Sequence, residues 1–239
     1  VLQSFKRLSV QDASLLGAPL FPGPILDSFW TDRCNDLSRA VDRLRLISSQ
    51  DALILLRASF SAPRVQHLLR GSPSADNAAL ATFDNLLHAA LNRLTNCNLS
   101  DMQWLQASLP IKDGGLGVRR VSSLAIPAFC SSAAGTSSLQ AAILFSRPCP
   151  ADFFLETYQA RWSTDHGTPP SGDPSHKQST WDRPGVLRDR ALVVSSLVDS
   201  RQKATFLAAA THHSGDWLMA LPIASCGLRL DDEAVRVAV

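Results

Sequence analysis

The chain has 239 residues, of which 45% are hydrophobic, enough for one compact domain with an appendage. Its five cysteines are odd in number and widely spaced, which argues against a disulfide framework or a zinc knuckle, and no apolar run approaches the roughly 20 residues of a membrane-spanning helix. The net charge of +2 is too small to indicate a nucleic-acid partner by itself. We therefore expect an intracellular protein, nuclear or cytoplasmic, without a membrane partner.

The N-terminal part is predicted to contain one short strand followed by helices. Residues 1–20 alternate weakly between apolar and polar side chains, which suits a strand that leaves a sheet. From Asp27 onward, apolar residues recur at helical spacing and predict an amphipathic helix of about five turns. A more buried helix begins near Ser48 and is kinked or restarted by Pro63, and a third amphipathic helix covers residues 80–94.

After the third helix, the pattern predicts shorter helices separated by breaks. Ser100 is expected to cap a short helix that comes before a glycine-rich turn. Residues 118–134 then predict a helix rich in serine and alanine, whose small side chains allow close packing. Residues 135–138 are expected to break this helix, and residues 139–145 to form another short one.

The C-terminal third begins with a segment of a different kind. Residues 163–184 are dominated by Gly, Pro, Ser, Thr, Asp and His, so we expect an exposed, disordered-looking insert. Helical periodicity returns over residues 186–210. The predicted fold is therefore mainly α, a helical bundle with a short β segment at the N-terminus and this insert. Its expected parts are residues 1–24, 25–150 and 151–239.

Motifs that carry catalytic chemistry are scarce. Phosphate-binding loops, zinc-protease motifs and nucleophile elbows are absent from the sequence. Asp231 and Asp232 could hold Mg²⁺ as a carboxylate pair, but they precede a helical pattern, where acids complement the helix dipole. His212 and His213 could ligate a metal, yet no Cys or His lies at ligand spacing. We therefore predict no catalytic residue and no metal ligand in this chain.

The most informative segment is a glycine-dense turn between two predicted helices, residues 109–120. Its backbone amides could approach phosphates, whose charge the flanking basic residues would neutralise. The alternative is a tight connection between helices, with the basic residues in water. The glycines are Gly114, Gly115 and Gly117, and the basic residues are Lys112, Arg119 and Arg120.

This turn also carries a family resemblance. Together with its neighbours it resembles the region after the catalytic core in the reverse transcriptases of non-LTR, LINE-like retrotransposons. The segments that carry the resemblance are 99–101, Gln103-Trp104, Leu109-Pro110, 114–117 and 124–128. Residues 16–20 are similar to the strand that leaves the palm in that family. Residues 217–222 and 230–233 resemble the segment that leads to its C-terminal Cys/His and nuclease regions.

The resemblance implies a position within a longer RNA-directed DNA polymerase. Residues 1–24 would end the palm, residues 25–150 would form the helical thumb, and residues 151–239 would form a connector. The implied partners are an RNA template with its DNA primer, and the upstream palm and fingers. The family's Tyr/Phe-x-Asp-Asp signature is absent here, so Mg²⁺ is implied for the parent polymerase only. We expect a non-catalytic fragment that grips template–primer nucleic acid through its backbone.

The expected phosphate contacts combine the glycine turn with arginines of the second predicted helix, before and after its restart at Pro63. They are Arg64, Lys112, Gly114, Gly115, Gly117, Arg119 and Arg120, with Arg57 and Arg70 next. Two alternatives remain open. The chain could be a decayed or repurposed scaffold that binds protein and no nucleic acid. It could also be a small-molecule enzyme, which a pocket holding several titratable groups would favour.

Overall fold

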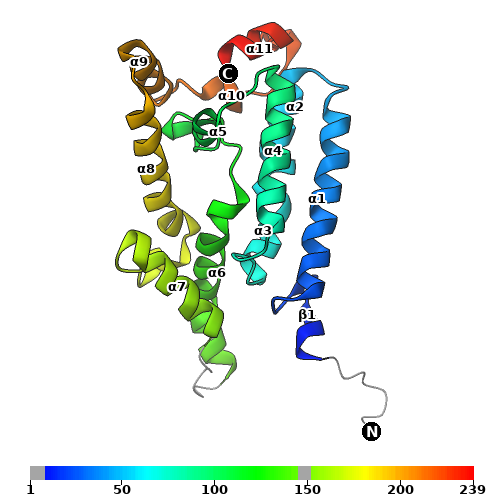
Figure 1. The fold of residues 1–239 in the computed structure, drawn as a ribbon, viewed down its shortest axis with the longest axis vertical. Coiled ribbons are helices and arrows are strands. Elements are labelled where there is room, and N and C mark those ends of the chain that lie inside the picture. The colour runs from blue at the N-terminus through cyan, green and yellow to red at the C-terminus, as the bar shows by residue number, and fades with distance from the viewer. Residues whose placement is uncertain (1–8, 145–151) are drawn as a thin grey trace.

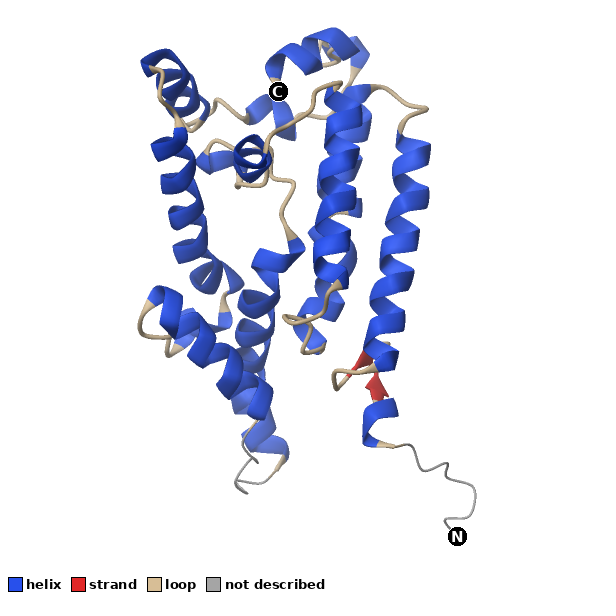
Figure 2. Ribbon diagram, in the orientation of Figure 1, coloured by secondary structure: helices blue, strands red, loops and turns tan. Residues whose placement is uncertain are grey.

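The structure, a computed structural model, describes residues 9–144 and 152–239 (Figure 1). It is 70% helical and contains one two-stranded antiparallel sheet (Figure 2). In this sheet β1 (Ser14–Leu15) pairs with β2 (Ala18–Pro19). Leu16 and Gly17 connect the strands with positive φ angles of 51° and 78°, as a tight hairpin requires. The predicted fold class, mainly α with a short β segment near the N-terminus, is confirmed.

Four helices build the main bundle. They are α1 (Pro24–Leu44), α2 (Ser49–Leu55), α3 (Ala62–Gly71) and α4 (Ala79–Thr95), and a π-helical turn, η2 (Leu56–Phe60), joins α2 to α3. Figure 1 shows α1 and α4 side by side. The predicted restart at Pro63 is confirmed, since α3 begins one residue before this proline, where its missing N–H costs no helical bond.

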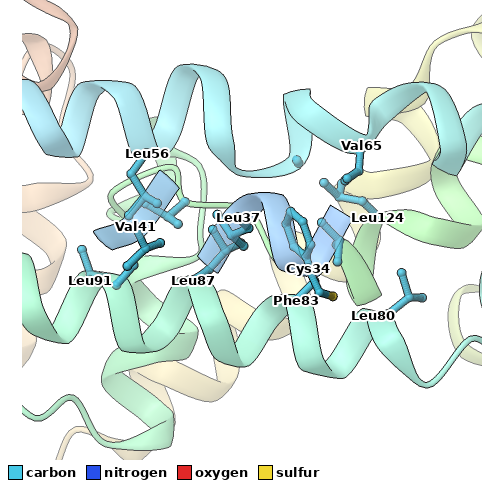
Figure 3. Packing of buried hydrophobic residues seen from close by; sticks show 14 of the residues in the cluster. Cys34, Leu37, Val41, Leu56, Val65, Leu80, Phe83, Leu87, Leu91 and Leu124 are labelled. Carbon is cyan, nitrogen blue, oxygen red and sulfur yellow. The ribbon is translucent and has the colours of Figure 1, made fainter. Parts of the chain in front are cut away.

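The core of this bundle follows from the apolar spacing along α1 and α4. Cys34, Leu37 and Val41 recur at helical spacing on α1 and are all buried. Figure 3 shows them against Phe83 and Leu87 of α4, beneath side chains from η2 and α3. Burying such side chains contributes about 1.5–3 kcal/mol each, so this interface fixes how the bundle is arranged.

The second half of the described chain adds seven α-helices around this bundle. They are α5 (Asp101–Ala107), α6 (Val121–Ile143), α7 (Phe153–His166), α8 (Gln178–Ser196), α9 (Ser200–Ala209), α10 (Asp216–Met219) and α11 (Asp232–Ala238). Four 3-10 turns complete the elements: η1 (Val10–Asp12), η3 (Ile111–Asp113), η4 (Asp173–His176) and η5 (Ala224–Cys226). Helix α6 packs against both α3 and α8. Leu218 and Val235 reach back into the main core.

One predicted break is wrong, and one break was not predicted. Helix α6 continues through residues 135–138, because a single glycine in a helix costs only about 1 kcal/mol relative to alanine. Conversely, the periodic stretch of residues 186–210 is two helices, since α8 ends at Ser196 and the side chain of Asp199 caps α9 by accepting the N–H of Arg201.

The segment predicted as a disordered-looking insert, residues 163–184, is largely ordered. Helix α7 ends at His166 and α8 begins at Gln178, so only a short connection lies between them. Trp181 is 1% exposed, and its indole N–H donates to the carbonyl of Ser175 at 2.8 Å. The prediction was wrong because it weighed the scarcity of aliphatic residues and overlooked how much surface one tryptophan buries.

Candidate nucleic-acid interface

The glycine turn lies against the C-terminal end of α5. Gly115 is the tightest point: a Cβ atom added there would lie 2.2 Å from the carbonyl oxygen of Leu109 and 2.5 Å from that of Gln106. Gly114 and Gly117 have positive φ angles of 91° and 75°, which favour glycine. The absence of a side chain at Gly115 therefore lets the turn lie close to the backbone carbonyls of Gln106 and Leu109.

The backbone amides of these glycines already donate within the turn. A donor N–H that is paired with a carbonyl inside the chain is not free for a phosphate oxygen. This corrects the expectation that Gly114, Gly115 and Gly117 cradle phosphate, and their role is structural. Their acceptors are, respectively, the carbonyl oxygens of Ile111 at 3.0 Å, Pro110 at 3.2 Å and Leu109 at 2.9 Å.

Arg119 and Arg120 follow the turn and point to α8. Arg119 Nη2 lies 2.7 Å from Asp182 Oδ1, and Arg120 Nη2 lies 2.5 Å from Asp189 Oδ2. All four side chains are largely buried, and the most exposed of them, Arg120, is 26% exposed. Both guanidinium groups are committed to carboxylates of this chain, so the structure does not present them as a phosphate-binding pair.

Arg57 and Lys112 occupy opposite environments. Arg57 extends from η2, packs beside Gly117 and donates to the carbonyl of Leu218. This hydrogen bond fastens η2 to α10, and burial lowers the pKa of the guanidinium group. Lys112 is exposed and has no ion-pair partner among residues 9–144 and 152–239.

Arg64 and Arg70 lie on the exposed face of α3. The side chain of Arg64 is 51% exposed, and Arg70 makes one long hydrogen bond, 3.3 Å, to Gln178 Oε1. His67 lies between them in the sequence and is also exposed. Residues 52–75 contain no acidic residue. The outer face of α3 is therefore a basic strip that no carboxylate of its own segment neutralises.

A groove between α1 and η2–α3 adjoins this strip and collects further arginines. Asp36 lies at its centre and accepts from Arg33 at 3.2 Å and from Arg39, while Arg64 Nη2 lies 3.8 Å away. Arg43 lines the same groove and has no acidic partner in the part of the chain that the structure describes. We call this feature the basic groove. It has a volume of about 540 Å³, and its lining is Asp36, Arg39, Ala40, Arg43, Leu44, Ile47, Leu55, Phe60 and Arg64.

Sequence reasoning identified Arg64 but missed Arg39 and Arg43. A signal was present, since these two arginines are four residues apart on the polar face of a predicted helix and so lie on one side of it. The sequence could not show that Arg64 of α3 lies across the groove from these arginines of α1, 3.8 Å from the carboxylate of Asp36. The predicted arginines are thus divided: Arg64 and Arg70 lie at this surface, and Arg57, Arg119 and Arg120 do not.

Comparisons with known proteins identify no relative. No family model matches the chain, and neither the curated proteins nor the solved structures contain a match.

A second cavity, of about 190 Å³ between α6, α7 and α8, holds several titratable groups. Its carboxylates already face arginines: Asp182 and Asp189 pair with the two arginines that precede α6, and Asp165 lies 3.8 Å from Arg188. Burial and then Arg188 lower the pKa of His166, which keeps its imidazole neutral near pH 7. The hydroxyl of Ser122, which lines this cavity, donates to Asp84 Oδ2 at 2.5 Å, and the same carboxylate accepts the N–H groups of Val121 and Ser122 at the start of α6.

Metal ligation requires grouped donor side chains, and crossing a membrane requires a long apolar helix. Within residues 9–144 and 152–239, no three His, Cys, Asp or Glu side chains are grouped as ligands of a metal ion. In the same ranges, no helix combines the length and the apolar character that crossing a bilayer demands. Asp231 caps α11 by accepting the N–H of Ala234 at 2.7 Å, as the capping interpretation of this acidic run predicts.

Proposed function

We propose that this chain binds nucleic acid through the basic groove and the adjoining face of α3, as a thumb-like part of a non-LTR reverse transcriptase. The observation that carries the proposal is the charge imbalance around Asp36. Three guanidinium groups, from Arg33, Arg39 and Arg64, surround this one carboxylate, and Arg43 adds a fourth positive charge without a partner in the described chain.

The imbalance favours a polyanion because the existing ion pairs are weak. The side chains of Arg39 and Arg64 are 69% and 51% exposed, and ion pairs of this kind stabilise a protein by about 0–1 kcal/mol. A nucleic-acid phosphate can therefore replace or share these contacts at little cost. Contacts of this type position the ligand without reading its sequence, as expected for a template–primer grip.

The sequence resemblance supports the same proposal from a different direction. The Gly-Gly-Leu-Gly turn, which carries the resemblance, holds α5 and α6 in place, and α6 in turn packs against α3. The turn would thus support the binding surface rather than form it. The family's catalytic carboxylate signature is missing from this sequence, so the proposal covers binding and assigns no nucleotidyl transfer to these residues.

The test is binding of an RNA–DNA hybrid duplex at several salt concentrations between about 50 and 200 mM. The triple variant Arg39→Gln, Arg43→Gln, Arg64→Gln removes three charges from the groove. Each lost phosphate contact lowers the slope of log affinity against log salt by about 0.7–0.9, so we expect a slope smaller by about two to three units.

A matched control removes three exposed charges elsewhere. Arg188, Arg201 and Lys203 lie outside the groove and the face of α3, and their replacement by Gln changes the net charge equally. If both triple variants lower the salt slope equally, the effect comes from net charge alone, and the assignment of the groove is contradicted. Absence of salt-dependent binding by the unmodified chain would contradict the function itself and favour a protein scaffold.

A further inference from the structure

We propose that the basic groove holds unpaired nucleotides, so that the preferred ligand is a duplex with a single-stranded overhang and not a blunt duplex. This inference rests on the proposed function, and it specifies which form of nucleic acid the groove takes. The observation behind it is the chemistry of the groove's lining, which is apolar as well as basic.

The apolar part of the lining is accessible to a ligand. Ile47 is 42% exposed and Leu55 is 39% exposed, and Phe60 and Leu44 line the groove beside them. A grip on the duplex backbone requires cations only, because stacked and paired bases keep their faces covered. An unpaired base exposes both faces, which gain from apolar and aromatic contact. The combination of arginines with an apolar lining is typical of sites for single strands.

Phe60 is the residue that we infer to contact the base. It ends the π-helical turn η2 and is partly buried, with one side packed against the main core. This packing restricts the ring, so little side-chain entropy is lost when a base stacks on it. Arg39, Arg43 and Arg64 line the same groove, where their planar guanidinium groups can contact phosphates of the same strand.

The size of the groove and its surroundings agree with this occupant. Its volume of about 540 Å³ lies within the range of about 300–1,000 Å³ found for sites that enclose small ligands. The positive surface continues beyond the groove along α3, past His67 to Arg70. An acidic amphipathic helix of a protein partner would match the groove alone, whereas a polyanionic strand leading into a duplex also matches this extension.

The experiment compares three probes with the full chain: a blunt RNA–DNA hybrid, the same hybrid with a single-stranded overhang, and the single strand alone. We expect the overhang to raise the affinity about fivefold or more, the lower end of the effect of one base–aromatic stack. Phe60→Leu removes the ring and keeps an apolar core contact. It should abolish most of this advantage, so that the overhang hybrid binds little better than the blunt hybrid.

A second variant guards against a folding defect in the first. Ile47→Gln changes an exposed side chain of the lining, and it should also reduce the preference for the overhang. Equal affinity for blunt and overhang hybrids, with both variants neutral, would overturn this inference. The proposed function would survive that result if the arginine triple variant still lowered the salt slope. Binding of an acidic helical peptide with no affinity for any nucleic-acid probe would overturn both.

Discussion

The carboxylate of Asp84, on α4, accepts the backbone N–H of Val121 at 2.7 Å in the first turn of α6. Its second oxygen accepts from the N–H and the hydroxyl of Ser122, at 3.2 and 2.5 Å. Arg120, at the N-cap of α6, provides no side-chain cap of its own. One buried acid of the main bundle therefore accepts the free N–H groups at the start of α6, the helix that joins this bundle to α8.

Replacing Asp84 by Ala should destabilise the protein by about 2–3 kcal/mol, because it leaves buried donors of Val121 and Ser122 without an acceptor. Asp84→Asn keeps one acceptor oxygen, so a smaller loss is expected. Urea denaturation followed by circular dichroism measures both values. If Asp84→Ala is as stable as the unmodified protein, these hydrogen bonds contribute nothing to stability.

The same residue gives a prediction for pH. Burial raises the pKa of Asp84 above its ordinary value of 3.8, and the hydrogen bonds from Ser122 and Val121 oppose this rise. The folded state therefore holds the proton more tightly than the unfolded state. As the pH rises from 3.8 through the folded pKa, the unfolding free energy should fall, and above that pKa this contribution should be constant. Asp84→Asn should lack this fall.

The measurement is the unfolding free energy of both proteins across this pH range. The diagnostic quantity is the difference between them, because all other titrating groups are shared. If the unmodified protein instead becomes more stable relative to Asp84→Asn as the pH rises, the hydrogen bonds at α6 outweigh the cost of burying the charge.

Reversing the charge of Arg120 should destabilise the fold by about 1–3 kcal/mol, since Arg120→Glu places a carboxylate against Asp189. Asp189→Arg in the same chain should restore part of the loss, and a double-mutant cycle gives the coupling energy, expected at about 0.5–3 kcal/mol. Should Arg120→Glu leave stability intact and weaken nucleic-acid binding instead, this arginine would belong to the binding surface after all.

Gly115→Ala should destabilise the protein by about 3 kcal/mol, because the new methyl group would overlap the carbonyl oxygen of Leu109 and the backbone must move. Gly135 provides a matched control of opposite sign. It lies inside α6, and the nearest atom to an added Cβ is 3.9 Å away, on His176. Gly135→Ala should therefore stabilise the protein by up to about 1 kcal/mol. Thermal unfolding of the two variants tests this contrast.

The elements that the sequence predicted well are those with a long and regular apolar spacing. Helices α1 and α4 each show it over several turns, so local pattern and tertiary packing agree. The insert prediction failed because order there depends on Trp181, which contacts Trp162 of the preceding helix at a ring-centroid distance of 5.2 Å. A single aromatic contact of this kind leaves no periodic signal.

The candidate site was only partly predictable for a related reason. Arg119 and Arg120 looked available for phosphate, since their partners Asp182 and Asp189 lie more than 60 residues away in the sequence. Local sequence identifies a charge but not its counter-ion. The groove arginines of α1 were missed by the same reasoning, because only the tertiary fold places Arg64 of α3 across the groove from them.

Residues near the C-terminal end complete the core of the N-terminal helices, and this has a consequence for the order of folding. Leu218 and Val235 belong to the main cluster, and Gln50 bonds to the backbone of Leu228 and Leu230, 178 and 180 residues away in sequence. Contacts of such long range close late, because loop closure costs entropy before they form. During synthesis, α2 and Arg57 would stay uncovered until residues 218–230 had been made.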